Sequence, residues 1–275
     1  MDSGKFAERR QYFMREITSK DNKIVKLCEQ LAARKYRDRL GLYLIEGENL
    51  LEEAVREGAA VDTVLMRKGY SGRMQPGLED KTFVLDEKLF DRLAQTNTSQ
   101  GILAIVKKPG VSQADFIEKG AVGNFVVLDR LQDPGNIGTI IRTADAAGYS
   151  LIVAMKGTAD VFSPKVVRAA AGSLFRVPVV FIDDYDELVA FVKAAGGKLV
   201  ATCFDTDRYY YDVDLTKNTA LIIGNEGNGI APELIERADV KIKIPMAGSI
   251  ESLNAAVAAA ILMYEGVRGR GTGQA

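Results

Sequence analysis

The sequence predicts an α/β protein built from two units, with a mostly parallel sheet in the C-terminal unit. Short apolar runs alternate with helix-like segments along most of the 275 residues, which is typical of buried strands alternating with covering helices. A breaker-rich segment, Lys107-Lys108-Pro109-Gly110, interrupts this alternation, and the chain is long enough for two domains. We therefore expect an N-terminal unit at 1–108, a linker at 109–120 and a C-terminal unit at 121–275.

The N-terminal unit is predicted to be a small α/β domain that opens with a basic helix. Residues 17–35 have the apolar spacing of a helix whose other face carries Lys and Arg, and Ser19 or Asp21 can serve as its N-cap. Further along we expect strands at 42–45, 61–66, 83–85 and 102–106, helices at 46–56 and 87–94, and a loop at 71–80.

The C-terminal unit alternates strand and helix more regularly. The expected strands are at 125–128, 151–154, 177–182, 198–203, 221–223 and 241–244. The expected helices are at 136–147, 164–171, 185–195, 231–237 and 252–265. This order predicts a parallel sheet with helices on both faces.

The composition excludes several kinds of chemistry. The chain has no histidine and only two cysteines, Cys28 and Cys203, so Ser-His and Cys-His nucleophile pairs and His- or Cys-built metal sites are excluded. We expect no metal. Two scattered cysteines, no signal-like N-terminus and no apolar run of about 20 residues predict a soluble cytoplasmic protein without a membrane segment. Any catalysis must then use Asn, Arg, Glu, Ser or a cofactor.

The charge is uneven along the chain. The net charge is −1, but the first 40 residues contain more Lys and Arg than Asp and Glu. This basic segment indicates either a polyanionic partner or a solvated chain end.

The first segment with chemical potential follows the expected strand at 125–128. Pro134-Gly135 turns the chain, Asn136 stands where an N-cap belongs, and Gly138 precedes Arg142 by one helical turn. Helical side chains lean toward the N-terminus, so Arg142 can lie over Gly138 and reach the helix start, where an anion binds favourably. This arrangement suits a phosphate or a phosphodiester. The alternative is a capped helix with one surface Arg.

Two further segments lie near the C-terminus. The turn Gly224-Asn225-Glu226-Gly227-Asn228-Gly229 lacks the spacing of a dinucleotide fingerprint, but its glycines allow close backbone approach to a ligand. The alternative is a tight turn with a solvated Glu226. Ser252 is a natural N-cap for an Ala-rich helix, which can pack closely against another element or subunit, or simply belong to the core.

Taken in order, these segments resemble one known family. N-x-G-x-x-x-R from Asn136, G-x-E-x-x-G around Glu226 and S-L-N at 252–254 are similar to the motifs of the SpoU/TrmH family. The segment 163–173 resembles the family's middle helix, and Ile17-Thr18-Ser19 with Ile45-Glu46-Gly47-Glu48-Asn49 resembles the substrate-binding domain of its rRNA-directed members. The resemblance covers nearly the whole chain.

The resemblance implies an S-adenosyl-L-methionine-dependent RNA ribose 2′-O-methyltransferase of the SPOUT class. Such proteins form a deep trefoil knot in the C-terminal parallel sheet and work as homodimers through that unit. The implied substrate is RNA, with 23S rRNA as the first choice. The alternatives are a tRNA 2′-O-methyltransferase and a non-catalytic RNA-binding protein with the same fold.

The resemblance also implies roles for individual residues. Those matching catalytic or supporting positions are Asn136, Arg142, Glu226, Ser252 and Asn254. Those matching the donor-binding loops are Thr202, Cys203, Phe204, Ile223, Gly224, Asn225, Gly227, Ile244, Pro245, Met246, Ser252 and Leu253. One departure is Ala255-Ala256, where many relatives have Val-Ser. Because a guanidinium stays protonated, we expect Arg142 to clamp a phosphate rather than to act as a base.

Overall fold

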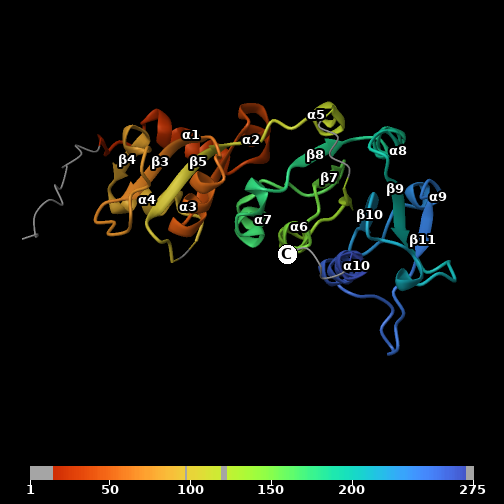
Figure 1. The fold of residues 1–275 in the computed structure, drawn as a ribbon. Coiled ribbons are helices and arrows are strands. Elements are labelled where there is room, and N and C mark those ends of the chain that lie inside the picture. The colour runs from red at the N-terminus through yellow and green to blue at the C-terminus, as the bar shows by residue number, and fades with distance from the viewer. Residues whose placement is uncertain (1–14, 97, 119–122, 271–275) are drawn as a thin grey trace, which may run out of the picture.

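The computed structural model describes residues 15–96, 98–118 and 123–270. Residues 1–14, at the start of the basic segment, lie outside these ranges, as do residues 97, 119–122 and 271–275. Within the described residues the chain forms a five-stranded and a six-stranded sheet, each covered by helices (Figure 1). The predicted α/β class is confirmed.

The N-terminal sheet mixes parallel and antiparallel pairs. Its strands are β1 (Arg15–Ile17), β2 (Leu42–Glu46), β3 (Val61–Arg67), β4 (Thr82–Leu85) and β5 (Ile102–Lys107), in the order β1-β4-β3-β5-β2. Its helices are α1 (Lys23–Leu31), α2 (Arg34–Leu40), α3 (Glu48–Arg56) and α4 (Glu87–Leu93), with a short 3-10 turn at Glu79–Lys81. β1, β4 and β3 run parallel, whereas β5 is antiparallel to both β3 and β2.

The helix predicted over 17–35 is wrong in extent. Its first residue, Ile17, belongs to β1, which pairs with β4, and the chain forms two helices, α1 and α2, instead of one. The cap is neither Ser19 nor Asp21: the side chain of Asn22 accepts a hydrogen bond from the Ile24 N–H at 2.8 Å. Asn22 is as good a cap as the predicted residues, and the edge pairing of β1 delays the start of the helix.

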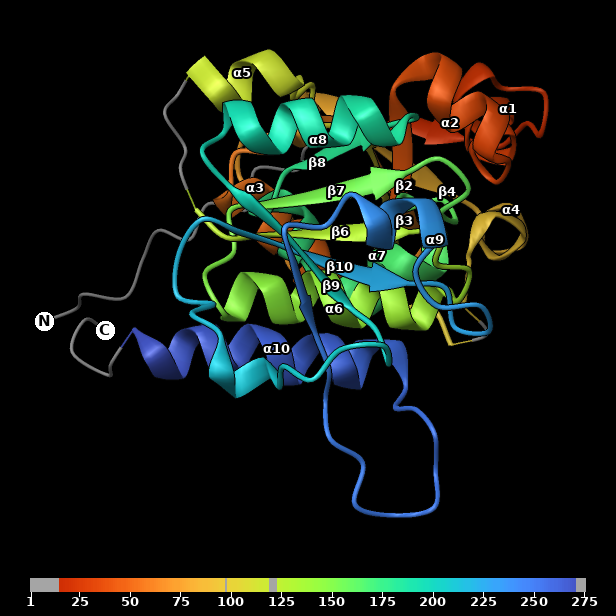
Figure 2. The same cartoon turned by 90° about the vertical axis from the view of Figure 1, so that its right-hand side faces the viewer.

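The C-terminal sheet is parallel throughout the described strands. They are β6 (Phe125–Asp129), β7 (Leu151–Met155), β8 (Val179–Ile182), β9 (Lys198–Thr202), β10 (Thr219–Gly224) and β11 (Val240–Ile242), in the order β11-β9-β10-β6-β7-β8. The helices are α5 (Gln113–Glu118), α6 (Pro134–Ala146), α7 (Pro164–Ala170), α8 (Tyr185–Ala194), α9 (Pro232–Glu236) and α10 (Ala255–Gly269), with 3-10 turns at Ser173–Phe175 and Tyr210–Asp212. α5 and α8 cover one face and α6 and α10 the other, as predicted (Figure 2).

The centre of this sheet is a topological switch point. β6 and β10 are neighbours, and the helices that follow them, α6 and α9, pack into the hydrophobic clusters on opposite faces of the sheet. In open α/β sheets, ligands bind outside the carboxyl ends of strands at such a point. The fold therefore predicts a ligand site at the loops that follow β6 and β10.

The two sheets share one hydrophobic core. Buried side chains of β2, α3 and β5 form a single cluster with those of α6, α7 and the strands of the C-terminal sheet. The Tyr43 ring lies 5.0 Å from the ring of Phe162, and α7 is the helix that faces the N-terminal unit (Figure 1). The predicted linker contains α5, whose Phe116 is buried against Phe125 and Phe191. The division of the chain at 109–120 stays a prediction.

A glycine allows α6 and α7 to approach closely. A Cβ on Gly138 would lie 2.3 Å from the Cβ of Ala169 and 2.9 Å from the carbonyl oxygen of Val166. Gly138 is buried in this contact. The predicted position of Arg142 over Gly138 therefore does not describe the function of this glycine, which is to bring two helices together.

Replacing Gly138 with Ala is expected to destabilise the protein by about 1–3 kcal/mol, because the added methyl group overpacks the contact between α6 and α7. This effect opposes the higher helix propensity of Ala, worth about 1 kcal/mol. Urea unfolding would measure the difference in the free energy of unfolding between Gly138→Ala and the wild type. Thr139→Ala, at the exposed neighbouring position, is the matched control and should change stability by less than about 0.5 kcal/mol. A Gly138→Ala protein as stable as the wild type would contradict the argument.

Candidate active site

Two loops meet at the switch point of the C-terminal sheet. The 130–133 loop follows β6, and the 225–229 loop follows β10. The side-chain amide of Asn225 donates to the carbonyl oxygen of Arg130 at 2.9 Å, while its oxygen accepts from the N–H groups of Gly227 and Asn228, both at 3.0 Å. Asn225 thus closes its own loop and attaches it to the neighbouring one.

Gly224 is required by the turn itself. A Cβ at this position would lie 2.2 Å from the backbone nitrogen of Ile230, so any larger residue would push the ends of the loop apart. Gly227 differs, because the nearest atom to its added Cβ is the Asn225 side-chain oxygen at 3.7 Å. A Cβ at Gly227 would therefore make only an ordinary van der Waals contact, so the turn itself does not require glycine at this position.

A chain of side-chain hydrogen bonds connects the three sequence motifs. The Glu226 carboxylate accepts from the Gln132 N–H at 3.1 Å, the Asp133 N–H at 3.0 Å and the Asn136 side-chain amide at 3.0 Å. The Asn136 side-chain oxygen in turn accepts from the Asn254 side-chain amide at 2.9 Å. Three motifs that lie far apart in sequence thus form one continuous polar network.

The network depends on where two helices begin. Asp133 caps α6 by accepting from the Asn136 N–H at 2.8 Å, so the prediction of Asn136 as the N-cap is wrong. Pro134 occupies the first helical turn, where its missing N–H costs nothing, and the helix starts earlier than expected. The side chain of Asn136 is therefore free to reach Glu226 and Asn254.

The predicted cap of the last helix is also wrong. α10 starts at Ala255, and Asn254 rather than Ser252 caps it by accepting from the N–H groups of Ala256 at 2.9 Å and Val257 at 3.3 Å. Asn254 therefore uses its oxygen for the helix and its amide for Asn136. Ser252 is exposed and has no hydrogen bond to any described residue.

The environment of Glu226 favours its charged form. Partial burial raises the pKa of this carboxyl group, but the hydrogen bonds from Asn136, Gln132 and Asp133 outweigh burial and hold the pKa below its ordinary value of 4.5. A carboxylate with a lowered pKa and three donors is a structural acceptor and a poor base.

Arg142 lies on the exposed side of α6. Among the described residues it has no hydrogen bond or ion-pair partner, and the structure does not bring it into contact with Glu226, Asn136 or Asn254. An exposed guanidinium without a carboxylate partner is available to bind an external anion.

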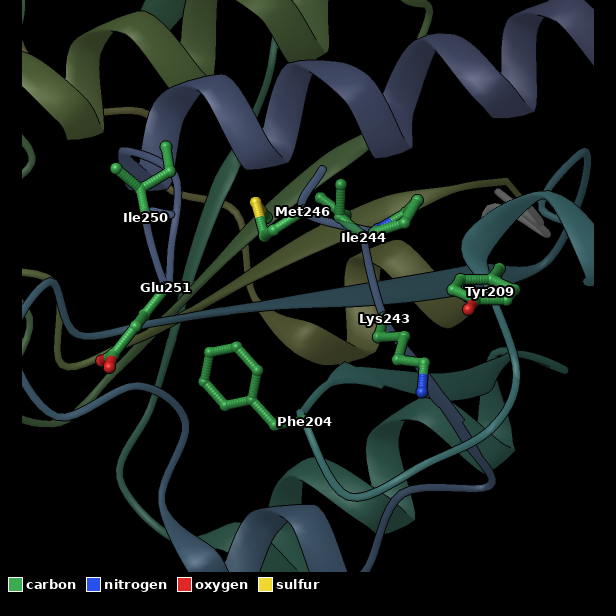
Figure 3. Close-up of a pocket in the computed structure, with 8 residues that line it drawn as sticks. Phe204, Tyr209, Lys243, Ile244, Met246, Ile250 and Glu251 are labelled. Carbon is green, nitrogen blue, oxygen red and sulfur yellow. The ribbon is translucent and has the colours of Figure 1, made fainter. Parts of the chain in front are cut away.

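A pocket of about 500 Å³ opens at the ends of β9 and β11 (Figure 3), and its lining residue Glu251 lies three positions before Asn254 in the chain. It is lined by Phe204, Tyr209, Lys243, Ile244, Pro245, Met246, Ile250 and Glu251. Of the predicted donor-binding residues, Phe204, Ile244, Pro245 and Met246 lie in the lining. Thr202 and Cys203 precede Phe204, Ser252 and Leu253 follow Glu251, and Ile223, Gly224, Asn225 and Gly227 lie at the end of β10 and in its loop.

Four residues of the lining were not predicted from the sequence, namely Tyr209, Lys243, Ile250 and Glu251. Tyr209 and Lys243 form an isolated parallel bridge, and the Lys243 ammonium lies 5.3 Å from the centre of the Tyr209 ring. The run of three tyrosines from Tyr209 to Tyr211 was an available signal for an aromatic wall.

The described residues form neither a metal-binding cluster nor a membrane-spanning helix. In that part of the chain, no group of His, Cys, Asp or Glu is arranged to hold a metal ion. None of its helices combines the length and the apolar character that crossing a membrane requires.

Comparisons with known proteins agree with this geometry. Residues 123–264 match the SpoU rRNA Methylase family, and residues 22–104 match the MRM3-like substrate binding domain. The chain is 39% identical to the 23S rRNA (guanosine(2553)-2′-O)-methyltransferase RlmP of Bacillus subtilis (strain 168), over 91% of this chain and 98% of the relative. It is 34% identical to the 23S rRNA (uridine(2479)-2′-O)-methyltransferase of Streptomyces viridochromogenes, over 94% of each chain.

Solved structures show the same similarity. The AdoMet-bound rRNA methyltransferase from Sinorhizobium meliloti superposes with a TM-score of 0.82 at 32% identity, over 93% of this chain and 98% of that one. The SpoU methyltransferase AviRb from Streptomyces viridochromogenes, in complex with AdoMet, gives 0.79 at 34% identity, over 92% of this chain and 100% of that one. The motifs, the fold and these matches agree, and the chain belongs to the SpoU rRNA Methylase family.

Proposed function

We propose that this protein transfers a methyl group from S-adenosylmethionine to a ribose 2′-OH of 23S rRNA. The observation that carries the proposal is the network from Glu226 through Asn136 to Asn254, which lies at the switch point of a sheet that has a pocket of cofactor size at the ends of β9 and β11. Relatives named as 23S rRNA 2′-O-methyltransferases match more than nine-tenths of the chain.

The pocket fits the methyl donor in size and chemistry. Its volume of about 500 Å³ lies within the usual range for small-molecule sites. Phe204, Ile244 and Met246 offer apolar walls for an adenine ring, and Lys243 and Glu251 offer opposite charges for the amino-acid end. When bound, S-adenosylmethionine supplies an electrophilic methyl group on a sulfonium.

The protein's own residues position the acceptor. Asn136 and Asn254 hold each other and the starts of α6 and α10, and Glu226 keeps Asn136 in place. Ser252, exposed next to the pocket, is available to the ribose or the donor. The transfer forms a bond between the ribose oxygen and the methyl carbon, breaks the bond from that carbon to sulfur and releases the hydroxyl proton. Catalysis of this kind depends mainly on proximity and orientation.

Arg142 binds the RNA phosphate next to the reacting ribose. Its guanidinium remains protonated and so cannot remove the hydroxyl proton, which passes to the neighbouring phosphate or to water. Its exposure and lack of a partner in the described chain support this role.

Several wider features belong to the same proposal. The chain works in the cytoplasm as a homodimer through its C-terminal unit, where Val257 and Tyr264 of α10 are each 49% exposed. The C-terminal unit, residues 121–275, contains a trefoil knot. The N-terminal unit, residues 1–108, binds the rRNA.

Ribose-methylation mapping by mass spectrometry tests the function. RNA from cells lacking the gene should lose one 2′-O-methyl group in 23S rRNA, and the purified protein should restore it with labelled S-adenosylmethionine. Methylation that appears only in the tRNA fraction would identify a tRNA enzyme. No methylation of either RNA, together with no donor binding by calorimetry, would leave a non-catalytic RNA-binding protein.

Arg142→Ala is expected to lower kcat by about 100-fold or more at saturating RNA, because an anion-binding group is lost next to the reacting ribose. Arg142→Lys should recover part of this loss, since the charge remains but the forked geometry does not. Single-turnover methyl transfer measures both variants, and Lys193→Ala, an exposed cation on α8, serves as the control. Full activity of Arg142→Ala at saturating RNA would exclude the proposed role.

Glu226→Gln should lower the melting temperature at pH 7 by about 2–4 °C, the effect of losing ~1 kcal/mol of hydrogen bonding. The pKa of Glu226 is lowered in the fold, so its stabilisation is present above the ordinary value of 4.5 and is lost as the pH falls through the lowered pKa. The difference between wild type and variant should therefore shrink in acid. Glu52→Gln, at an exposed position of α3, should change the melting temperature little at either pH. A difference in melting temperature between wild type and Glu226→Gln that stays constant down to acid pH would contradict a stabilising role of the charged Glu226 carboxylate.

A further inference from the structure

A buried ion pair joins the two units. The side chains of Arg37, from α2, and Asp160 are only 5% and 8% exposed. The Asp160 Oδ2 atom lies 2.5 Å from Nη2 and 2.7 Å from Nε of Arg37. The remaining nitrogen, Nη1, donates to the carbonyl oxygens of Leu31 at 2.6 Å and Ala32 at 2.8 Å. Each nitrogen of the guanidinium therefore has an oxygen partner.

Such a pair is a poor device for stability alone. Removing two charges from water costs about as much as their attraction returns, and well-packed apolar residues often serve equally well. What two contacts from one guanidinium to the Asp160 Oδ2 atom supply is geometry, because they hold both partners at a fixed distance and orientation. The pair between Arg37 and Asp160 fixes the position of Asp160 relative to α2.

Asp160 belongs to the 156–163 loop, which connects β7 to α7. This loop is bonded to the neighbouring 130–133 loop: the Ala159 N–H donates to the Leu131 carbonyl at 2.8 Å, and the Gln132 side-chain amide donates to the Gly157 carbonyl at 2.6 Å. These two hydrogen bonds couple the position of Asp160 to the position of the 130–133 loop.

The connection ends in the candidate active site. The backbone N–H groups of Gln132 and Asp133 are the same groups that hold the Glu226 carboxylate, which in turn holds Asn136. A continuous series of short polar contacts therefore runs from Arg37 in the N-terminal unit to Asn136.

The N-terminal end of this series lies next to exposed cations. Lys35 and Arg39 of α2 are exposed, and neither has a carboxylate partner among the described residues. Figure 2 shows α1 and α2 on the side of the molecule toward which the arrows of β7 and β10 point. An RNA that contacts α2 can therefore extend to the carboxyl edge of the C-terminal sheet.

We propose that Arg37 and Asp160 are positioning residues that hold the RNA-contacting surface of α2 in a fixed relation to the 130–133 loop and Asn136. The inference rests on the proposed rRNA methylation. Neither residue touches the reacting atoms. Loosening the pair leaves RNA and donor binding intact but places the target ribose incorrectly, so the loss appears in kcat.

The test uses the full chain with 23S rRNA and S-adenosylmethionine. Asp160→Asn keeps the shape of the side chain and an acceptor for the Phe162 N–H, which bonds Asp160 at 2.9 Å, but removes the charge. We expect its single-turnover rate at saturating substrates to fall by at least about tenfold, since small misplacements of reacting groups are costly. The dissociation constants for RNA and donor should stay within about twofold, the signature of an interaction that matters only for positioning.

Arg176→Met is the matched control. Arg176 also crosses the interface, binding Glu53 of α3 and, at 2.7 Å, Asp145 of α6, but it has no bond to the 130–133 loop. Its rate should remain within about twofold of the wild type. The number of donor molecules bound per chain gives the folded fraction of each variant, and each rate is divided by that fraction. If Asp160→Asn does not fold, the double variant Arg37→Met/Asp160→Leu replaces the pair with apolar groups and gives the measurement.

The outcomes separate the two proposals. A folded Asp160→Asn or double variant that methylates at the wild-type rate overturns the positioning role. An equal loss in Arg176→Met also overturns it, because the effect would then belong to the interface in general. A wild-type protein that binds 23S rRNA without methylating it refutes the proposed function instead.

Discussion

The Glu226 carboxylate is the contact on which the candidate site depends. It lies in the loop after β10. It accepts hydrogen bonds from two backbone N–H groups of the loop after β6 and from the side-chain amide of Asn136. β6 and β10 are neighbours in the sheet, but the helices that follow them go to opposite faces, so without a cross-connection their loops would separate. Hydrogen bonds to a charged acceptor are stronger than those to a neutral one. This strength suits a site that must keep its shape when exposed to solvent.

The other constraints act on the same edge of the sheet. Gly138 lets α6 approach α7 closely, and this sets the direction of the helix that carries Asn136 and Arg142. Asn254 connects the start of α10 to Asn136, so the last helix is held in register with α6. The 156–163 loop attaches the N-terminal unit to this arrangement. Side-chain hydrogen bonds thus connect the loops after β6, β7 and β10 to one another and to the start of α10.

Much of this could be predicted from sequence, because local patterns determine it. Apolar runs located the strands, and the motifs around Asn136, Glu226 and Asn254 were expected at the ends of strands and starts of helices. The errors arose where several residues could serve equally well. Asn136 and Ser252 are good N-caps locally, but Asp133 and Asn254 take those positions. Arg37 lies outside the helix predicted at 17–35 and no role was predicted for it, because only the docking of the second unit buries it beside Asp160. Tyr209 and Lys243 become neighbours through a bridge between distant segments, which no local pattern contains.

The chemistry of the site follows from what its polar groups are already bonded to. Glu226 is the carboxylate of the polar network, yet its lowered pKa and three donors make it a weak proton acceptor. Asn136 and Asn254 use their amides on each other, on Glu226 and on a helix start, and neither can take a proton at neutral pH. Arg142 stays charged. In the proposed function, a site built in this way promotes methyl transfer by holding the donor and the ribose in line, and the proton leaves to a group that the RNA or the solvent provides. The rate should therefore be sensitive to how rigidly the loops are held, which explains why so many of its polar side chains bind one another.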